Sequence, residues 1–191
     1  MDDDGSYSEC IQFVKDAVAD GIQKVIIDVT GNTGGSDFYG TGILDALGFN
    51  YCRMGFVIRY SQATEKYRGT WRSNGYRTTQ SFKYRSENKN EIELKVFCDE
   101  YSGSAAISGM VALCSNSNLG EIVGRMPGQN VNFCGNGTKF QLTHSKVVYL
   151  LPLTYSYFER DGQKAPDQLT VDIEVPAESN FMDFIVWQND V

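Results

Sequence analysis

The chain has 191 residues, of which 41% are hydrophobic, and a formal net charge of −7. This length suits one domain with a sizeable core, and the composition excludes collagen-like and largely disordered classes. No apolar run approaches the roughly 20 residues that a membrane span needs. We therefore expect a single domain over residues 1–191 and no membrane span.

The first five residues are acidic, unlike the basic start of a signal peptide. Any export signal or further domain would lie upstream of residue 1. The sequence does not decide the cellular compartment of the protein. The protein would be secreted or in the cell envelope if an upstream signal exists, and cytoplasmic otherwise.

The cysteines indicate neither a metal site nor a disulfide framework. They are odd in number, form no CxxC pair and occur with one histidine in the whole chain. We expect free cysteines, no metal and no cofactor. The five are Cys10, Cys52, Cys98, Cys114 and Cys134.

Charge is unevenly distributed along the chain. Residues 53–90 carry nine Lys or Arg against two Glu, a local +7 that leaves −14 for the remainder. Aromatic residues alternate with these basic ones, a pattern that can bind single-stranded nucleic acid. The pattern also suits twisted strands with a solvated face, which we favour. We therefore interpret residues 53–92 as a strand or hairpin insertion and do not expect a nucleic-acid partner.

The first elements indicate an α/β beginning. Helical spacing of Ile11, Val14 and Val18 predicts a helix over 7–20, which Gly21 closes. Residues 24–30 are nearly all apolar and β-branched, as in a strand buried on both faces. A tight glycine-rich loop at 31–36 precedes a second helix at about 38–48.

The second half continues this alternation and then changes to antiparallel patterns. We predict a buried strand at 94–98, a helix rich in small residues from 104 to 114, and a third core strand at 121–124. A long Gly/Asn loop through residue 138 follows. Alternating patterns predict further strands at 139–143, 146–151, 153–158 and 171–175. The fold class is therefore α/β with an added antiparallel region.

Ser104 begins the helix that follows the strand at 94–98. A serine hydroxyl is a weak nucleophile until a base takes its proton, and a helix N-terminus offers free N–H groups for a developing oxyanion. The small neighbours Gly103 and Ala105 would allow a substrate backbone to approach. The alternative is that Ser104 only caps the helix.

Gly34 and Gly35 form a turn after the first core strand. Neighbouring parallel strands end at one edge of the sheet, where α/β proteins place ligands. One glycine N–H and the Ala105 N–H would then form a two-donor oxyanion hole. The alternative is an ordinary glycine turn.

Four motifs, in order, resemble the S41 serine peptidases, the group of the C-terminal-processing, tricorn and retinoid-binding proteins. They are the strand and Asn-x-Gly-Gly loop at 25–35, the strand and Ser-Ala-Ala segment at 96–106, the Val-Gly to Phe-Gln-Leu stretch at 122–142, and the closing strands at 153–176. The resemblance covers roughly 24–176.

The resemblance implies a ClpP/crotonase-like β/α core that hydrolyses peptide bonds through an acyl-enzyme. It implies that Ser104 is the nucleophile and that the backbone N–H groups of Gly34 or Gly35 and of Ala105 form the oxyanion hole. The implied substrate is a peptide or an unfolded protein, bound as an added strand beside the site.

The general base departs from the family pattern. Processing-type members use a Lys after the nucleophile, but motif matching places Asn136 there and an ungapped count places Gln129 there. Neither amide can accept the serine proton. Tricorn-like members use a His located before the core, and we expect this chain to begin after that segment.

Local substitutes for the base are weak. His144 lies between two predicted strands and is more simply a surface residue in a hairpin turn. Lys139 and Lys146 flank the same turn, and a lysine base would need burial to lower its pKa. Glu159 is the candidate for an acidic partner of a His supplied from elsewhere, against the alternative of a solvated turn. Two family Glu positions are also changed, to Ile107 and Arg125.

Three functional hypotheses remain. The first is a serine peptidase whose base lies outside this chain. The second is a catalytically inactive S41-like domain that binds a peptide or apolar ligand. The third is a different crotonase-like activity or a nucleic-acid partner.

Overall fold

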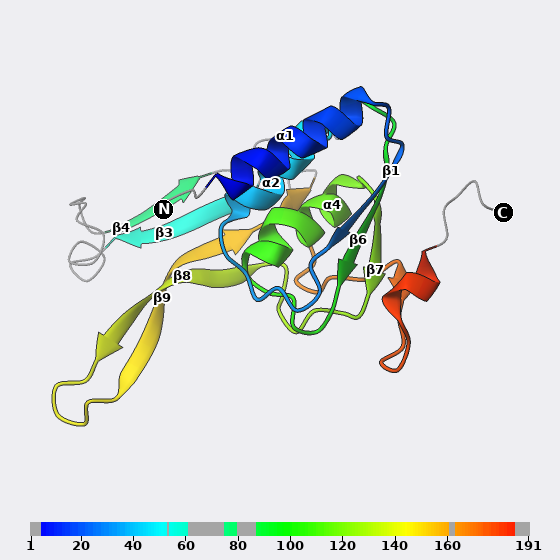
Figure 1. The fold of residues 1–191 in the computed structure, drawn as a ribbon. Helices are drawn as coiled ribbons and strands as arrows, with labels where there is room; N and C mark the ends of the chain where they lie inside the picture. Colours follow the sequence, from blue (N-terminus) through cyan, green and yellow to red (C-terminus); the bar gives the residue numbers. More distant parts are fainter. Residues whose placement is uncertain (1–4, 53, 61–74, 80–86, 161–162, 186–191) are drawn as a thin grey trace.

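The structure is a computed structural model that describes residues 5–52, 54–60, 75–79, 87–160 and 163–185. It contains a parallel sheet of four strands in the order β1-β6-β7-β12 (Figure 1). These strands are β1 (Lys24–Asp28), β6 (Glu93–Cys98), β7 (Glu121–Gly124) and β12 (Ile173–Glu174). The expected α/β class is thereby confirmed.

The central strand β6 is buried on both faces because its side chains alternate between two apolar clusters. Leu94, Val96 and Cys98 point into the main core. Phe97 points to the opposite face, where it packs with Val123 and the C-terminal segment. An apolar run of this kind is typical of an interior strand of a parallel sheet.

Helices cover the face of the main core. They are α1 (Ser6–Ala19), α2 (Asp37–Ala46), the π-helical η1 (Ile107–Val111) and α4 (Ala112–Ser117). Small residues let α2 and η1 approach closely: a Cβ on Gly40 would collide with the carbonyl oxygen of Gly109. The predicted helices are confirmed, with Gly21 beyond the end of α1 at φ +84°.

The expectation that the first strand is buried on both faces is wrong. β1 is an edge strand, and Ile26 is 37% exposed on it. The second apolar cluster, around Phe97, Val123 and Val175, covers β6 and β7 but not β1. An edge position cannot be inferred from an apolar run, because such a run specifies the side chains and not the neighbouring strands.

A second sheet is antiparallel, with strands in the order β4-β3-β9-β8. It comprises β3 (Gly55–Tyr60), β4 (Gly75–Thr79), β8 (Phe133–Gln141) and β9 (Val148–Tyr157). β8 and β9 extend from the body as a long hairpin (Figure 1), which we call the arm, residues 133–157.

The prediction of a loop through residue 138 is wrong, because the first strand of the arm covers part of it. β8 begins at Phe133, and the two strands replace the three expected over 139–158. Pairing with β9 overrides the turn signals of Gly135 and Gly137, and the side chain of Leu150 lies where a Cβ on Gly137 would stand. Asn136 takes a positive φ of 52° within the strand.

Short elements complete the described chain. They are β2 (Phe49–Asn50) paired with β5 (Glu87–Asn88), β10 (Glu159–Arg160) paired with β11 (Gln163–Lys164), and the 3-10 helix η2 (Phe181–Phe184). Within residues 53–92, the turn signal at 73–74 and most basic and aromatic positions lie outside the described residues.

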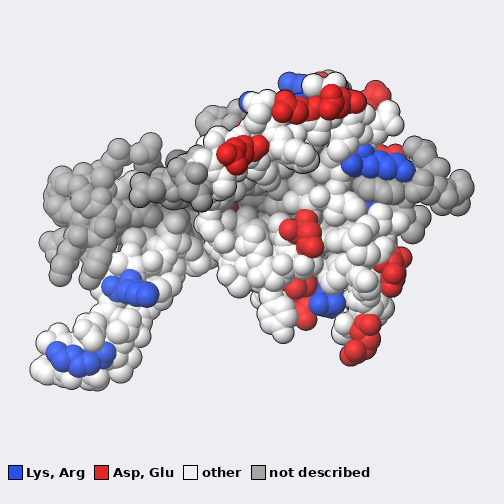
Figure 2. Space-filling model, viewed as in Figure 1, with Lys and Arg blue, Asp and Glu red and all other residues white. Residues whose placement is uncertain are grey.

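The described charged residues differ between the arm and the body. Lys139 and Lys146 are the charged residues of the arm, whereas the body carries side chains of both signs, with several acidic ones on the face drawn (Figure 2). All five cysteines are free, as expected. No helix in the described ranges has the length and apolar character that a bilayer crossing requires.

The different burial of β7, inside the parallel sheet, and β1, at its edge, generates a stability prediction. Ile122 on β7 is fully buried, whereas Ile26 on β1 is 37% exposed. We expect Ile122→Ala to lower the free energy of unfolding by about 2–5 kcal/mol, because it leaves a cavity in the main core. Ile26→Ala should cost less than about 1 kcal/mol. Urea denaturation of both variants measures the difference, and equal losses would contradict the assignment of β1 to an open edge.

Candidate active site

Two loops meet at the carboxyl edge of the parallel sheet. One follows β1 and contains Gly34, and the other follows β6 and contains Ser104. The N–H of Val29 donates to the carbonyl oxygen of Phe97 at 2.9 Å, and the N–H of Gly103 donates to that of Asn32 at 2.9 Å. The strand ends thus lie side by side, as the sequence predicted.

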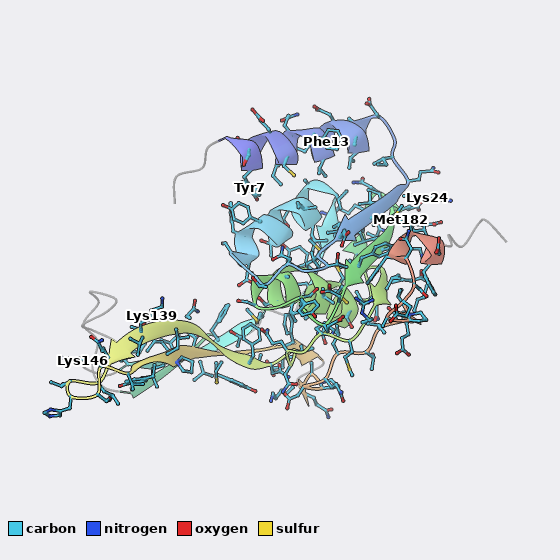
Figure 3. All side chains as sticks on the ribbon, turned by 60° about the horizontal axis from the view of Figure 1, so that its bottom comes forward. Tyr7, Phe13, Lys24, Lys139, Lys146 and Met182 are labelled. Atoms are coloured by element: carbon cyan, nitrogen blue, oxygen red, sulfur yellow. The ribbon has the colours of Figure 1, made fainter. Side chains whose placement is uncertain are left out.

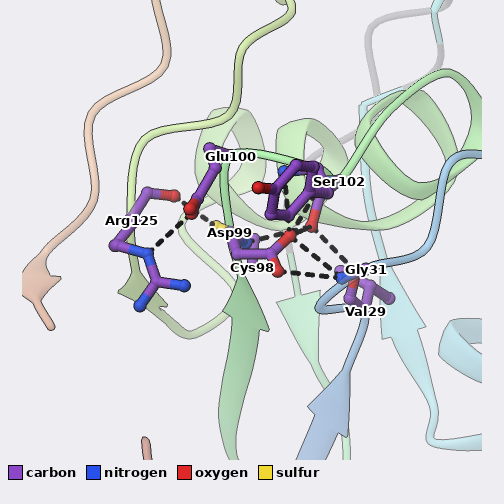
Figure 4. Close-up of polar contacts among 8 residues, drawn as sticks. Val29, Gly31, Cys98, Asp99, Glu100, Ser102 and Arg125 are labelled. Atoms are coloured by element: carbon purple, nitrogen blue, oxygen red, sulfur yellow. Dashed lines mark hydrogen bonds and ion pairs between the residues drawn. The ribbon is translucent and has the colours of Figure 1, made fainter. Parts of the chain in front are cut away.

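The buried carboxylate of Asp99 joins these loops (Figure 4). Its two oxygens accept the N–H of Gly31, from the other loop, at 2.9 and 3.0 Å. One of them also accepts the N–H groups of Tyr101 and Ser102 at 3.1 and 3.0 Å. A carboxylate with several N–H donors is a strong anchor, because charge-assisted bonds are stronger than neutral ones.

Ser102 completes this anchor. Its hydroxyl donates to the carbonyl oxygen of Val29 at 2.8 Å and accepts the Asp99 N–H at 3.0 Å. Burial, with a smaller contribution from the charge of Asp99, raises the pKa of the adjacent Cys98 thiol to about 12. Cys98 is therefore a neutral core residue and not a candidate nucleophile.

Ser104 has a left-handed backbone conformation, with φ +48°. This region is unusual for a residue with a side chain, and such residues are often found at functional sites. The carbonyl oxygen of Ser104 accepts the N–H groups of Ile107 and Ser108 at 3.0 and 2.9 Å, so the residue opens the helical segment. Ser104 is exposed, and its hydroxyl has no hydrogen bond within the described ranges.

Gly34 lies directly against this serine. A Cβ built on Gly34 would stand 2.5 Å from the Ser104 Cβ and 3.1 Å from its Oγ. Any side chain at position 34 would therefore collide with the serine. The sequence predicted that the 34–35 turn and residue 104 meet, and the geometry brings them together.

The backbone N–H groups around Ser104 differ in availability. The Gly34 N–H donates to Asn32 Oδ1 at 2.9 Å. The N–H groups of Gly35 and Ala105 have no hydrogen-bond partner among the residues that the structure describes. Of the two glycines named from the sequence, Gly35 is thus the one with a donor to offer.

A pocket of about 240 Å³ opens beside these groups. It is lined by both glycines, Ala105 and Ala106, and by residues of α2 and η1. Among these are Tyr39, Ile43 and Met110. The pocket is mainly apolar, which suits an apolar side chain of a bound ligand.

Gln129 and Asn136 are the two residues that the sequence offered for the lysine position. Gln129 Oε1 accepts the Ser104 N–H at 2.8 Å. Asn136 lies on the arm and donates from Nδ2 to Thr154 Oγ1 at 2.9 Å. Of the two, Gln129 is therefore the one in contact with the candidate site, whereas the Gly-x-Gly-Thr string around Asn136 belongs to β8.

The remaining candidates lie elsewhere. His144 occupies the exposed turn at the tip of the arm. Lys139 and Lys146 are on the arm, away from the helices (Figure 3). Glu159 is half-exposed on β10 and makes no hydrogen bond to Ser104. Glu159 follows Phe158, whose N–H donates to the buried Asn132 at 2.8 Å.

The two changed family positions have structural roles. Ile107 is fully buried in the main core. Arg125 donates from Nε to Glu100 at 2.6 Å, and this hydrogen bond from Arg125 lowers the pKa of the Glu100 carboxyl. The Arg125 guanidinium also stacks 5.1 Å from the ring centre of Phe181, at the far side of the sheet.

The fold and the site define an α/β domain with an exposed, strained serine that opens a helix beside a glycine turn. Residues 2–175 match the model of peptidase family S41. The chain therefore belongs to this family and is a domain of the serine peptidase type. No curated protein matches the sequence.

Solved structures of low sequence identity share the fold. Mature CPAF has a TM-score of 0.60 at 14% identity and the photosystem II D1 C-terminal processing protease 0.53 at 16%. A lipoprotein from Streptococcus agalactiae has 0.52 at 15% identity. Each match covers 92% of this chain. The chain spans 44%, 40% and 58% of those proteins, respectively.

The Asp99 anchor generates the second prediction. Asp99→Asn should lower the free energy of unfolding by about 2 kcal/mol, because the amide would turn a donor toward N–H groups that need an acceptor. Asp28→Asn is the matched control, since Asp28 accepts only from Thr30 within one turn, at 2.9 and 2.8 Å. It should cost less than about 1 kcal/mol. Urea denaturation tests this, and an Asp99→Asn variant as stable as the control would refute the role of the anchor.

Proposed function

We propose that this chain carries the nucleophile and the oxyanion hole of a serine peptidase that hydrolyses peptide bonds through an acyl-enzyme on Ser104. The observation that carries the proposal is the contact of Gly34 with Ser104 at the meeting of two strand ends. The strained φ of Ser104 supports it, because a cap residue has no need of a left-handed conformation.

The oxyanion would be held by the N–H groups of Gly35 and Ala105. Both are without a partner among the described residues, and both line the pocket beside Ser104. A pair of preorganised donors at a helix start stabilises the negative charge that develops on a substrate carbonyl. Gly34 would contribute by its lack of a side chain, since its own N–H is held by Asn32.

The general base would come from outside this chain. Neither Gln129 nor Asn136, the two candidates for the lysine position, can accept a proton from serine, and the described Lys and His side chains form no hydrogen bond with Ser104. Glu159 is the proposed acidic partner that would orient an incoming histidine. The proposed substrate is a peptide or an unfolded protein. It would pair as an added strand with β1, which is an outer strand of the parallel sheet among the described residues.

The second candidate is a catalytically inactive domain that retains the cleft for peptide or ligand binding. The observation that favours it is the amide of Gln129 beside the nucleophile. The two candidates differ in whether Ser104 reacts when a base is supplied.

A fluorophosphonate probe separates the two candidates. We expect Ser104 to be labelled in a longer chain extended upstream of residue 1, and peptide hydrolysis to be abolished by Ser104→Ala. The substitution should change the free energy of unfolding by no more than about 1 kcal/mol, the size of a lost cap. Ser145→Ala, at the exposed tip of the arm, is the control and should hydrolyse peptides normally. Equal turnover by Ser104→Ala would end the peptidase proposal, and absence of labelling in both lengths of chain would favour the binding domain.

A further inference from the structure

Gln129 and Ser104 are in contact, and each has a polar side-chain group without a hydrogen-bond partner among the described residues. Gln129 Oε1 accepts the Ser104 N–H at 2.8 Å, which fixes the side-chain amide so that Nε2 is its other end. Nε2 is fully buried and has no hydrogen-bond partner among the described residues. The hydroxyl of Ser104 has none either within those ranges.

A buried donor without an acceptor is costly, and native structures rarely leave one unpaired. Nε2 belongs to the same side-chain amide as the oxygen that accepts the serine N–H, so the Ser104 hydroxyl is a candidate acceptor for it.

We propose that Gln129 is a positioning residue for Ser104 and acts through both ends of its amide. Oε1 holds the serine backbone in its left-handed conformation, and Nε2 donates to Oγ. With Nε2 occupying one lone pair of Oγ, the hydroxyl proton points away from Gln129 and toward the open side of the site. This inference rests on the proposed function, since a base approaching from that side would find the proton already directed to it.

The same contact explains which donors are left for the oxyanion. Gln129 occupies the N–H of the nucleophile itself, so that N–H is not available to a substrate carbonyl. The free N–H groups of Gly35 and Ala105 remain. Gln129 thus both positions the nucleophile and restricts the oxyanion hole to two donors.

Amide hydrogen exchange tests the backbone half without any activity assay. Gln129→Met removes the acceptor at nearly constant size, and we expect exchange of the Ser104 N–H to rise about tenfold or more. Gln129→Glu keeps an acceptor and should leave this exchange slow. Gln12→Met, on the exposed side of α1, is the control for loss of a glutamine. Unchanged exchange in Gln129→Met would overturn the backbone half.

The side-chain NH₂ signals of Gln129 test the hydroxyl half. Ser104→Ala removes Oγ but keeps the backbone N–H. The NMR signal of one Gln129 NH₂ proton should therefore shift, and that proton should exchange faster. The hydrogen bond from the residue-104 N–H to Gln129 Oε1 should be unchanged. NH₂ signals identical in parent and Ser104→Ala would overturn this half.

Reactivity adds a readout that a purely structural role would not alter. In the longer chain, fluorophosphonate labelling should fall about tenfold in Gln129→Met. In Gln129→Glu it should also fall at neutral pH, because the carboxylate has no donor to offer Oγ. Labelling at the parent rate in both variants would overturn the proposal. If no form is labelled while both exchange results hold, the proposed hydrolysis fails and the positioning role stands.

Discussion

The carboxylate of Asp99 is the interaction on which the site depends. The loop after β1 and the turn after β6 are joined by few backbone bonds, and neither is regular secondary structure. Asp99 accepts N–H groups from both, at 2.9 to 3.1 Å, and is itself buried. Because two of these bonds go to Gly31 on the opposite loop, the anchor fixes the distance between the glycine turn and Ser104.

That fixed distance makes the backbone strain at Ser104 sustainable. A residue with a side chain in the left-handed region costs of order 1–3 kcal/mol and persists only where its surroundings determine it. Here the surroundings are Gly34, whose lack of a side chain leaves space for the serine, and Gln129, which holds the serine N–H. The left-handed conformation thus depends on two contacts from two other segments of the chain, and each can be removed separately.

Sequence reasoning located the parts of the site that follow from strand ends. Apolar runs followed by glycine or by a small-residue helix indicate where parallel strands stop, and this placed Ser104, Gly34 and Ala105 together. It missed Asp99, although an Asp and a Ser three residues apart after a buried strand are a signal for a side-chain-stabilised turn. It left Gln129 and Asn136 undecided for the lysine position, because a motif match and an ungapped count disagreed. The contact of Gln129 with Ser104 joins two segments 25 residues apart and could not be read from local sequence.

The errors in the fold have a common physical cause. The first part of β8, residues 133–138, was assigned to a loop because its glycines and asparagines are local turn signals. Its pairing with β9 depends on residues up to 23 positions away. β1 was taken as an interior strand because its apolar residues do not specify which strands flank it. Pairing partners and sheet edges are long-range properties, and local propensity is overridden wherever they decide.

The arrangement of Ser104 and the N–H groups of Gly35 and Ala105 bears on both candidate functions. A domain that had lost all use for the site would gain stability by relaxing Ser104 out of the left-handed region and by pairing the N–H groups of Gly35 and Ala105. Instead the described residues keep a strained serine, two unpaired N–H groups and a mainly apolar pocket at one edge of the sheet. N–H donors of this kind suit an oxygen acceptor from water or from a ligand. Under both proposed functions that acceptor would be the carbonyl oxygen of a ligand. The side-chain amide of Gln129, which contacts Ser104, cannot act as a base. The supply of a base is therefore what distinguishes the peptidase from the binding domain.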